Sequence, residues 1–385
     1  MPVLTLDELR EHARQRLPGP VWDFIEGGSG DEHTLRAGEA AYRELCLRPR
    51  VLVDVADPDC ALELLGTPLA SPFGVAPMAY HRLVHPQGET ATAEGTARAG
   101  ALLVVGMFAS RPLEDIASAG GPRWLQVYWL RRRDALAGLV DRAEAAGFGA
   151  LMLTVDAPQV ARRRRDVRNA FALPADVTAV NLDPGLTERT HRATAGSSGI
   201  EAHAREQFDP TLTWDDLSWL RERTRLPLVL KGVLTAEDAR IAVECGVDAL
   251  VVSNHGGRQL DRAVPALQAL PEVVASVPES CPVLIDGGVR SGADAAIALA
   301  LGARAVLVGR PVLWGLAHAG AEGVGQVLGL LRSELLETMA LSGCPSLAGL
   351  GPTAVSRRPP LRDHPWPPSH GEPSRTASTT SGGLR

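Results

Sequence analysis

The sequence has few cysteines, and none of them is spaced as in a metal site or a disulfide framework. Five cysteines are scattered over 385 residues without a C-x-x-C pair (Cys46, Cys60, Cys245, Cys281 and Cys344). An odd number of isolated thiols is typical of reduced cytosolic proteins. We therefore expect a cytoplasmic protein, and we predict no metal site.

The sequence also has no long apolar run, and its first residues do not have the pattern of a secretory signal peptide. The longest run of apolar residues and glycine, residues 100–109, is half of the roughly 20 residues that cross a bilayer. Residues 1–19 carry charges throughout and contain no apolar stretch followed by small residues. These absences predict a soluble protein with neither a membrane span nor a secretory leader.

The chain has no excess of positive charge. Lysine and arginine number 39 against 45 aspartates and glutamates, which gives a formal net charge of −6 at pH 7. This balance implies no polyanion as partner. One basic run, residues 162–165, directly follows a predicted strand, so we expect one of its arginines to enter a site. Nucleic-acid binding by this run is the less favoured alternative.

What is present is an ordinary globular composition, with 45% apolar residues. Residues 1 to 45 are predicted to be helical. Beyond them, short β-branched runs alternate with Ala-rich amphipathic segments that end at glycine. The predicted strands are residues 73–76, 102–105, 125–127, 151–155, 228–230, 249–252, 283–285 and 305–308. Eight buried strands in this alternation predict an α/β fold, a (β/α)8 TIM barrel. An open dinucleotide-binding sheet is disfavoured because its G-x-G-x-x-G turn is absent.

We assign residues 1–351 to this barrel. Residues 174–211, between the fourth and fifth predicted strands, are polar and too numerous for an ordinary connection, so they are a lid candidate. Residues 352–385 are rich in Pro, Ser, Thr and Arg and cannot bury a core. They are predicted to be a disordered tail.

Polar residues follow the predicted strands, at the face where such barrels place their active sites. The glycine-rich segments after the seventh and eighth strands each carry an arginine, Arg290 and Arg310, and together they favour a phosphate site. Tight-turn chemistry alone is the alternative. Lys231 ends an apolar strand, so it must face the mouth of the barrel or form a structural ion pair.

The motif SNHGGRQLD, residues 253–261, is the strongest signal. His255 is a possible base, and Arg258 is a cation that can hold a carboxylate with two hydrogen bonds. Asp156 at another strand end could accept the second ring proton of His255. A turn or helix cap is the alternative role for Asp156.

With LTVDAP, LVLKGV, LIDGGVRSG and VGRP in order, this motif resembles the FMN-dependent α-hydroxy acid oxidase and dehydrogenase family over residues 5 to 350. DFIEGGSGDE, APMAYHRLVHPQGE, QVYWL and RNAFALP are most similar to members that oxidise p-hydroxymandelate. The resemblance implies that His255 is the catalytic base with Asp156 as its partner. It also implies that Arg163 and Arg258 bind the substrate carboxylate and that Tyr128 contacts the substrate.

The resemblance implies FMN as cofactor. Lys231 would lie against the pyrimidine edge of the flavin, and Gln126, Thr154 and Ser253 would hydrogen-bond the ring. The backbone of Ala76, Pro77 and Met78 would follow the ring edge. The ribityl chain and phosphate would be held by Asp286, Gly288, Arg290, Gly309 and Arg310. The implied partners are a 2-hydroxy acid and O2, and the implied assembly is a homotetramer.

The sequence departs from common family members at four positions, where Phe24 replaces Tyr, Met78 replaces Thr, Gly106 replaces Ser and Phe108 replaces Trp. These changes predict an apolar substrate wall of Phe24, Tyr80, Gly106, Phe108 and Val160. We therefore expect an oxidase of aryl or bulky 2-hydroxy acids that makes the 2-keto acid and hydrogen peroxide. The alternatives are a lactate or glycolate oxidase or dehydrogenase, another FMN barrel such as a type 2 isopentenyl diphosphate isomerase, and a silent flavin-binding module.

Overall fold

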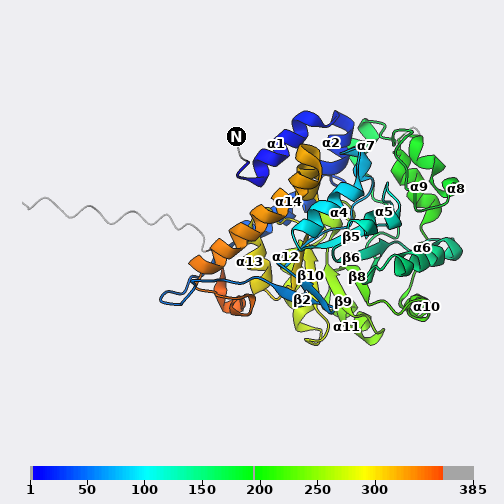
Figure 1. Cartoon of the computed structure of the whole chain (residues 1–385). Coiled ribbons are helices and arrows are strands. Elements are labelled where there is room, and N and C mark those ends of the chain that lie inside the picture. The colour runs from blue at the N-terminus through cyan, green and yellow to red at the C-terminus, as the bar shows by residue number, and fades with distance from the viewer. Residues whose placement is uncertain (1–2, 194–195, 359–385) are drawn as a thin grey trace, which may run out of the picture.

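A closed barrel of eight parallel strands forms the centre of the molecule (Figure 1). The computed structural model describes residues 3–193 and 196–358. The barrel strands follow one another in chain order: β4 (Phe73–Val75), β5 (Leu102–Gly106), β6 (Arg123–Val127), β7 (Leu151–Thr154), β8 (Leu228–Val233), β9 (Ala249–Val252), β10 (Val283–Asp286) and β11 (Ala305–Val308). All eight predicted strands are confirmed.

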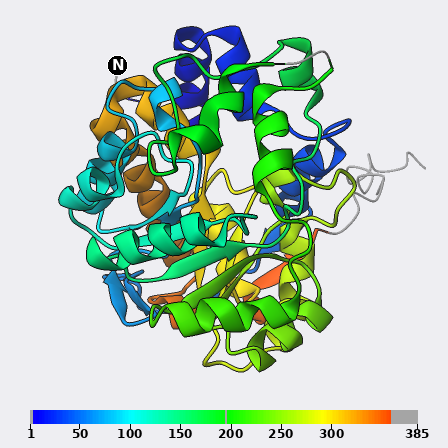
Figure 2. The ribbon, with the colours of Figure 1, turned by 90° about the vertical axis from the view of Figure 1, so that its right-hand side faces the viewer.

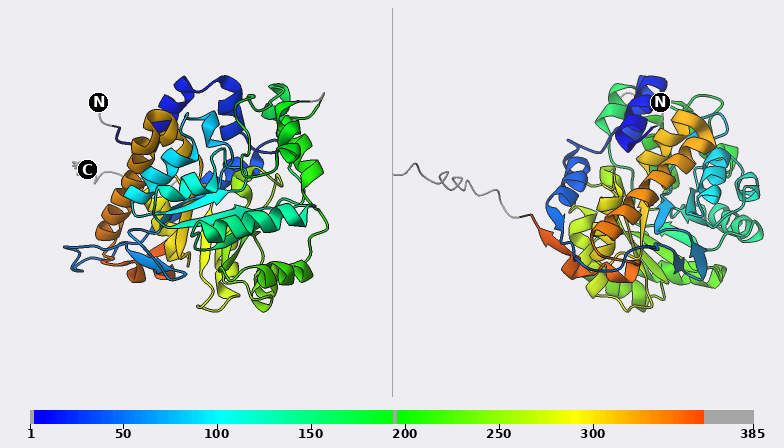
Figure 3. Two further views of the ribbon diagram at one scale, coloured as in Figure 1. Left: turned by 45° about the vertical axis from the view of Figure 1, so that its right-hand side comes forward. Right: turned by 60° about the vertical axis from the view of Figure 1, so that its left-hand side comes forward.

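Helices surround the barrel: α4 (Glu89–Arg98), α5 (Leu113–Ser118), α6 (Arg133–Ala145), α10 (Leu217–Arg223), α11 (Ala236–Glu244), α12 (Ala266–Ala275), α13 (Gly292–Ala300) and α14 (Arg310–Leu341). The glycines predicted to end α6, α11 and α13 have φ values of +73°, +76° and +104° (Gly147, Gly246 and Gly302). That left-handed conformation suits glycine because it has no Cβ. The long helix α14 runs along the outside of the barrel (Figure 3) and packs on α4 and α13.

The N-terminal segment forms α1 (Leu6–Arg16), α2 (Gly19–Glu26) and α3 (His33–Arg43), as predicted. The region expected to be a lid contains α8 (Pro184–Thr187) and α9 (Gly199–Gln207), preceded by α7 (Arg164–Arg168). Figure 2 shows α1 and α2, in blue, and the green segment with α8 and α9 grouped at one end of the molecule, beyond the strands. The polar segment is therefore partly helical.

The opposite end of the barrel is closed by a hairpin of β2 (Leu62–Leu64) and β3 (Thr67–Leu69). Leu64 and Leu69 are buried in one apolar cluster with the barrel-interior residues Val104, Met152 and Leu307. Apolar side chains fill this end of the barrel, whereas the polar residues lie at the other end, where the strands finish.

The predicted boundary of the tail at residue 352 is wrong. Residues 352–357 form a 3-10 turn (Pro352–Ala354) and strand β12 (Val355–Arg357), which pairs antiparallel with β1 (Leu45–Leu47). Backbone groups form this ladder, so the polar composition does not prevent it. Residues 359–385 of the predicted tail lie outside the described residues. No helix in the described part of the chain has the length and apolar character needed to cross a membrane.

Candidate active site

His255 is positioned by a strained turn just after β9. Its φ of +60° lies in the left-handed region, which is uncommon for a residue with a Cβ and is often found at functional sites. The Ser253 Oγ accepts the His255 backbone N–H at 3.0 Å. The ring lies between two polar partners: Nδ1 is 3.0 Å from Asp156 Oδ1, and Nε2 is 3.3 Å from the Tyr128 hydroxyl. The predicted pair of His255 and Asp156 is therefore present.

The electrostatics favour a neutral imidazole beside an ionised carboxylate. Burial lowers the pKa of His255 below its usual value, although Asp156 acts in the opposite direction. Burial alone would raise the pKa of Asp156, but His255 and Lys231 outweigh it and lower that pKa. His255 can therefore accept a proton at neutral pH, and Asp156 can stabilise the resulting cation.

An irregularity in β8 makes room for this pair. Gly232 has a φ of +114°, and a Cβ at this position would lie 2.6 Å from the Asp156 Cβ. A larger residue would therefore collide with Asp156 and strain the backbone. The pairing register of β8 and β9 shifts between Lys231 and Val233, which marks a bulge. The bulge thus lies directly behind the carboxylate that orients His255.

Lys231 is buried, with 3% of its surface exposed. Its Nζ lies 3.0 Å from Asp286 Oδ2 and donates to the Ser253 Oγ at 2.9 Å. Burial alone would lower the pKa of Lys231, but the carboxylates of Asp286 and Asp156 outweigh it and raise that pKa. A permanent cation therefore faces the cavity, since Lys231 also lines it.

Cations dominate the charged lining of this cavity. Among the described residues, five cationic side chains and one carboxylate line it: Arg163, Lys231, Arg258, Arg290, Arg310 and Asp286. Burial, assisted by Arg163 and Arg310, holds the pKa of Arg258 well below its usual range. Burial also lowers the pKa of Arg310 to about 10. Such crowding of like charges favours an anionic ligand.

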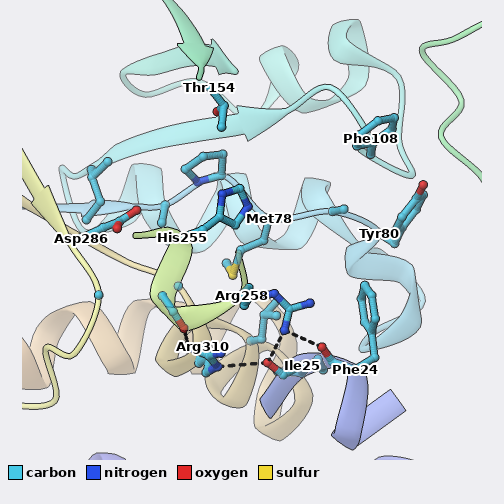
Figure 4. Close-up of a pocket in the computed structure, with 18 of the residues that line it drawn as sticks. Phe24, Ile25, Met78, Tyr80, Phe108, Thr154, His255, Arg258, Asp286 and Arg310 are labelled. Carbon is cyan, nitrogen blue, oxygen red and sulfur yellow. Dashed lines mark hydrogen bonds between the residues drawn. The ribbon is translucent and has the colours of Figure 1, made fainter. Parts of the chain in front are cut away.

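Two of these arginines are held by the C-terminal end of α2 (Figure 4). Arg258 Nη1 donates to the backbone carbonyls of Phe24 and Gly27, at 2.7 and 2.8 Å, and Arg310 Nε donates to that of Ile25 at 3.0 Å. The negative end of the helix dipole lies there, so it stabilises both cations. Because these bonds engage Nη1 of Arg258, its other donors are available to a ligand.

Arg163 is the arginine of the basic run that enters the cavity. It is buried, and its Nε has no hydrogen-bond partner among the described residues. Arg163 Nη1 lies 3.8 Å from Asp166 Oδ2, and its neighbours in the run form ion pairs of their own, Arg164 with Asp31 and Arg165 with Glu32. The structure thus places Arg163 of this run in the lining of the cavity, and its Nε, without a partner among the described residues, suits a carboxylate.

A phosphate cradle lies where β10 and β11 end. Gly287 and Gly288 have φ values of +90° and +82°, and a Cβ on Gly288 would lie 2.2 Å from the Gly38 carbonyl oxygen. The start of α14 has no side-chain cap at Gly309, so backbone N–H groups there are open to an anion. Asp286 Oδ1 is buried with no partner in the described part of the chain, which suits a ribityl hydroxyl. A site for a phosphate and a carboxylate for a ribityl hydroxyl thus lie together, and this combination fits FMN.

Most of the residues predicted to meet the flavin ring line the same cavity as His255. Ala76, Pro77, Met78 and Thr154 line the cavity, and Met78 and Thr154 appear near His255 in Figure 4. Gln126 is buried and donates to the Thr154 Oγ1 at 3.0 Å. Gln126 and Ser253 are not among the described lining residues, so they lie behind the side chains that line the cavity.

Four of the five residues predicted to form the apolar wall line the cavity. Phe24, Tyr80, Phe108 and Val160 line the cavity, and Tyr80 and Phe108 lie at the end away from Asp286 (Figure 4). Gly106 is not among the described lining residues. A Cβ on Gly106 would lie 2.9 Å from the Met78 carbonyl oxygen, because this face of β5 meets the backbone after β4.

Sequence reasoning missed the contribution of α9. Ile200, His203 and Ala204 on α9, and Phe208 directly after it, line the cavity. Residues 200, 204 and 208 are spaced by four, which is the helical period of one apolar face. That pattern was the available signal within a segment expected to be irregular.

This barrel, with a partly buried base facing a cationic cavity at the ends of its strands, has the arrangement expected of a flavin-dependent oxidoreductase. A family model described as FMN-dependent dehydrogenase matches residues 13–357. The chain belongs to this family, which establishes FMN as its cofactor.

Individual relatives span almost the whole chain. The 4-hydroxymandelate oxidase of Amycolatopsis orientalis is 48% identical over 347 residues, covering 90% of this chain and 96% of the relative. The L-lactate oxidase of a Nostoc species is 46% identical over 349 residues, covering 89% and 95%. A crystal structure of a mandelate oxidase with (S)-4-hydroxymandelic acid superposes with a TM-score of 0.89 at 46% identity, covering 92% of this chain and 99% of that one.

Proposed function

We propose that this FMN-dependent enzyme oxidises (S)-2-hydroxy acids that carry an aryl group. The products are the 2-keto acid and, from O2, hydrogen peroxide. One observation supports this proposal above the others: a neutral His255 shares one cavity with Arg163, Arg258 and an aromatic wall. The arginines select the acid, the histidine performs the chemistry, and the wall selects the side chain.

The chain's own groups account for substrate binding and proton transfer. The unpaired donors of Arg163 and Arg258 would hold the carboxylate, and the Tyr128 hydroxyl would contact the substrate beside His255 Nε2. His255 would take one proton, from the α-carbon or from the hydroxyl, and Asp156 would stabilise the imidazolium. FMN supplies the two-electron acceptor when it is bound, and O2 takes up the electrons and protons as hydrogen peroxide.

The cofactor would be held along the remaining length of the cavity. Lys231 would stabilise negative charge at the pyrimidine edge of the flavin, while Gln126, Thr154 and Ser253 would hydrogen-bond the ring. The backbone of residues 76–78 would follow its edge. Asp286, Gly288, Arg290, Gly309 and Arg310 would bind the ribityl chain and phosphate.

The aromatic wall supports an aryl substrate over a small one. Phe108 has ring neighbours on several sides: Tyr80 at 6.1 Å, Tyr128 at 5.7 Å and Phe208 at 6.0 Å between centroids. Burying an aryl ring against such a wall contributes about 1.5 to 3 kcal/mol, enough for a tenfold preference. Both mandelate-type and lactate-type oxidases occur among the similar relatives, so the wall is the feature that favours an aryl substrate.

The test compares kcat/KM for (S)-mandelate, (S)-lactate and glycolate by peroxide release, with anaerobic bleaching of the flavin as the second readout. We expect mandelate to exceed both small acids at least tenfold, since only its ring contacts the wall. His255→Ala should keep its FMN and lose at least about a hundredfold in turnover.

A small acid equal to mandelate would overturn the aryl assignment. A flavin that no hydroxy acid bleaches would instead favour a silent flavin-binding module or an isomerase.

Two finer assignments complete the proposal. The isolated thiols support a reducing, cytoplasmic compartment, and the resemblance stated above supports a homotetramer. Light scattering coupled to gel filtration tests the assembly, and a monomer at working concentration would exclude it.

A further inference from the structure

A buried histidine that the proposed chemistry does not use lies in the same cavity. His203 comes from α9, is 1% exposed and lines the cavity with Ile200 and Phe208. Its ring packs edge-on against Phe108 at 5.4 Å between centroids. Because Phe108 lies at the end of the cavity away from Asp286 (Figure 4), His203 also belongs to this distal end.

The ring of His203 is neutral and incompletely paired. Burial lowers its pKa to about 4, although the backbone of Leu186 acts weakly in the opposite direction. Neither ring nitrogen has a hydrogen-bond partner of good geometry among the described residues. A neutral imidazole has one donor nitrogen and one acceptor nitrogen. Even with Leu186 near one of them, the other is left for a ligand.

The surroundings of His203 make this free nitrogen unusual. Leu83, Val84, Ile200, Phe108 and Phe208 line the cavity with apolar surface. Tyr80, whose buried hydroxyl also has no partner in the described part of the chain, is another polar residue there. Buried polar groups are normally paired, so an unpaired one in a binding cavity indicates a ligand or a water molecule that completes it.

We propose that His203 is a specificity-determining residue that hydrogen-bonds a hydroxyl group on the aromatic ring of the substrate. The substrate class is then a ring-hydroxylated aryl 2-hydroxy acid, with the phenolic hydroxyl on the side of the ring away from the carboxylate. A neutral histidine suits a phenol, which both donates and accepts a hydrogen bond. This inference rests on the proposed function, because it requires an aryl ring against the wall.

The first measurement is made on the unaltered holoenzyme. We compare kcat/KM for (S)-4-hydroxymandelate, (S)-mandelate and (S)-4-methylmandelate, the last having a group of similar size that cannot hydrogen-bond. The 4-hydroxy acid should exceed both others at least about tenfold, because it alone pairs the free nitrogen. A 4-methyl acid that equals the 4-hydroxy acid would show that size alone is selected and would overturn the proposal.

The second measurement assigns the preference to one residue. His203→Leu should lower the ratio of kcat/KM for the 4-hydroxy acid over mandelate at least about tenfold. His203→Gln, which keeps a neutral donor and acceptor, should restore part of that ratio. His191→Leu is the matched control, since His191 lies in the same segment but does not line the cavity, and it should leave the ratio unchanged.

The remaining outcomes separate the two proposals. Equal losses for both substrates in His203→Leu and His203→Gln would mean a structural role and would overturn the assignment. So would a loss of the ratio in Tyr80→Phe that His203→Leu does not reproduce. An enzyme that oxidises mandelate and its 4-hydroxy form equally well loses only this inference, whereas one that oxidises neither loses the proposed function with it.

Discussion

At the scale of single residues, Asp156 controls the protonation of His255. The Asp156 carboxylate raises the pKa of His255 against the effect of burial. Asp156→Asn removes that charge, so the pKa of His255 falls further. The active form is the neutral base, and activity is lost as the pH drops through this pKa. The acidic limb of the pH profile of kcat/KM should therefore move to lower pH.

The same variant should lose at least about tenfold in kcat, because the imidazolium is no longer stabilised and the ring no longer held. Steady-state kinetics between pH 4 and about 8 measures both effects. Asp248→Asn is the control, since Asp248 lies at the other end of β9, where it pairs with Arg221. An acidic limb that stays in place, or moves to higher pH, would contradict the role given to Asp156.

Single residues differ in how well the sequence predicts their place. His255 and Asp156 come just after strands and Lys231 lies near the end of one, so the position of active sites in such barrels brings them together. Gly106 faces the backbone of Met78, because the direction of a residue at a strand end depends on the local backbone, which spacing does not specify. His203 was missed because its helix lies in a polar segment. Its proposed role also depends on a ring nitrogen that lacks a hydrogen-bond partner, which a sequence cannot show.

At the scale of elements, the β2–β3 hairpin acts as a stability element remote from the chemistry. Leu64 is 1% exposed and packs with the barrel interior. Leu64→Ala should lower the free energy of unfolding by about 2 to 5 kcal/mol, because it removes buried apolar surface and leaves a cavity. Denaturant unfolding of the holoenzyme measures this loss, and kcat/KM should stay within about twofold.

The same substitution at an exposed leucine serves as the control, because it changes helix or strand propensity without removing buried surface. Leu341→Ala at the end of α14, where the side chain is 73% exposed, should change stability by less than about 0.5 kcal/mol. Equal losses at both positions, or a large change in kcat/KM for Leu64→Ala, would contradict the separation of the hairpin from the active site.

Elements with strong apolar patterns were the predictable ones. The barrel strands are apolar runs buried on both faces, as parallel strands between helices must be, so their positions followed from composition alone. Strand β12 did not, because an edge pairing uses backbone groups and leaves little pattern in side chains. Helix α9 carried a short apolar stripe that its polar surroundings obscured.

At the scale of the whole molecule, the distribution of charge is uneven. The net charge is −6, yet cations dominate the charged lining of the active-site cavity. The surface elsewhere therefore carries the excess negative charge, and the cavity is the region that attracts a phosphate and a carboxylate. Arginine supplies nearly all of the positive charge, because Lys231 is the only lysine among the 39 basic residues.

This single lysine makes Lys231 a reporter of the folded state of the entire barrel. An amine-reactive acylating reagent needs an accessible, neutral amine, whereas Lys231 is buried, and Asp286 and Asp156 raise its pKa against the effect of burial. The native protein should therefore acquire one label rapidly, at the chain's amino terminus, and a second only when the barrel opens. Intact-mass measurements over time should show the second label appearing at least about a hundredfold faster in denaturant, and bound FMN should slow it further because ligand binding stabilises the folded state. Two labels arriving together in the native holoenzyme would mean that Lys231 is open to solvent, and its proposed contact with the flavin would then be lost.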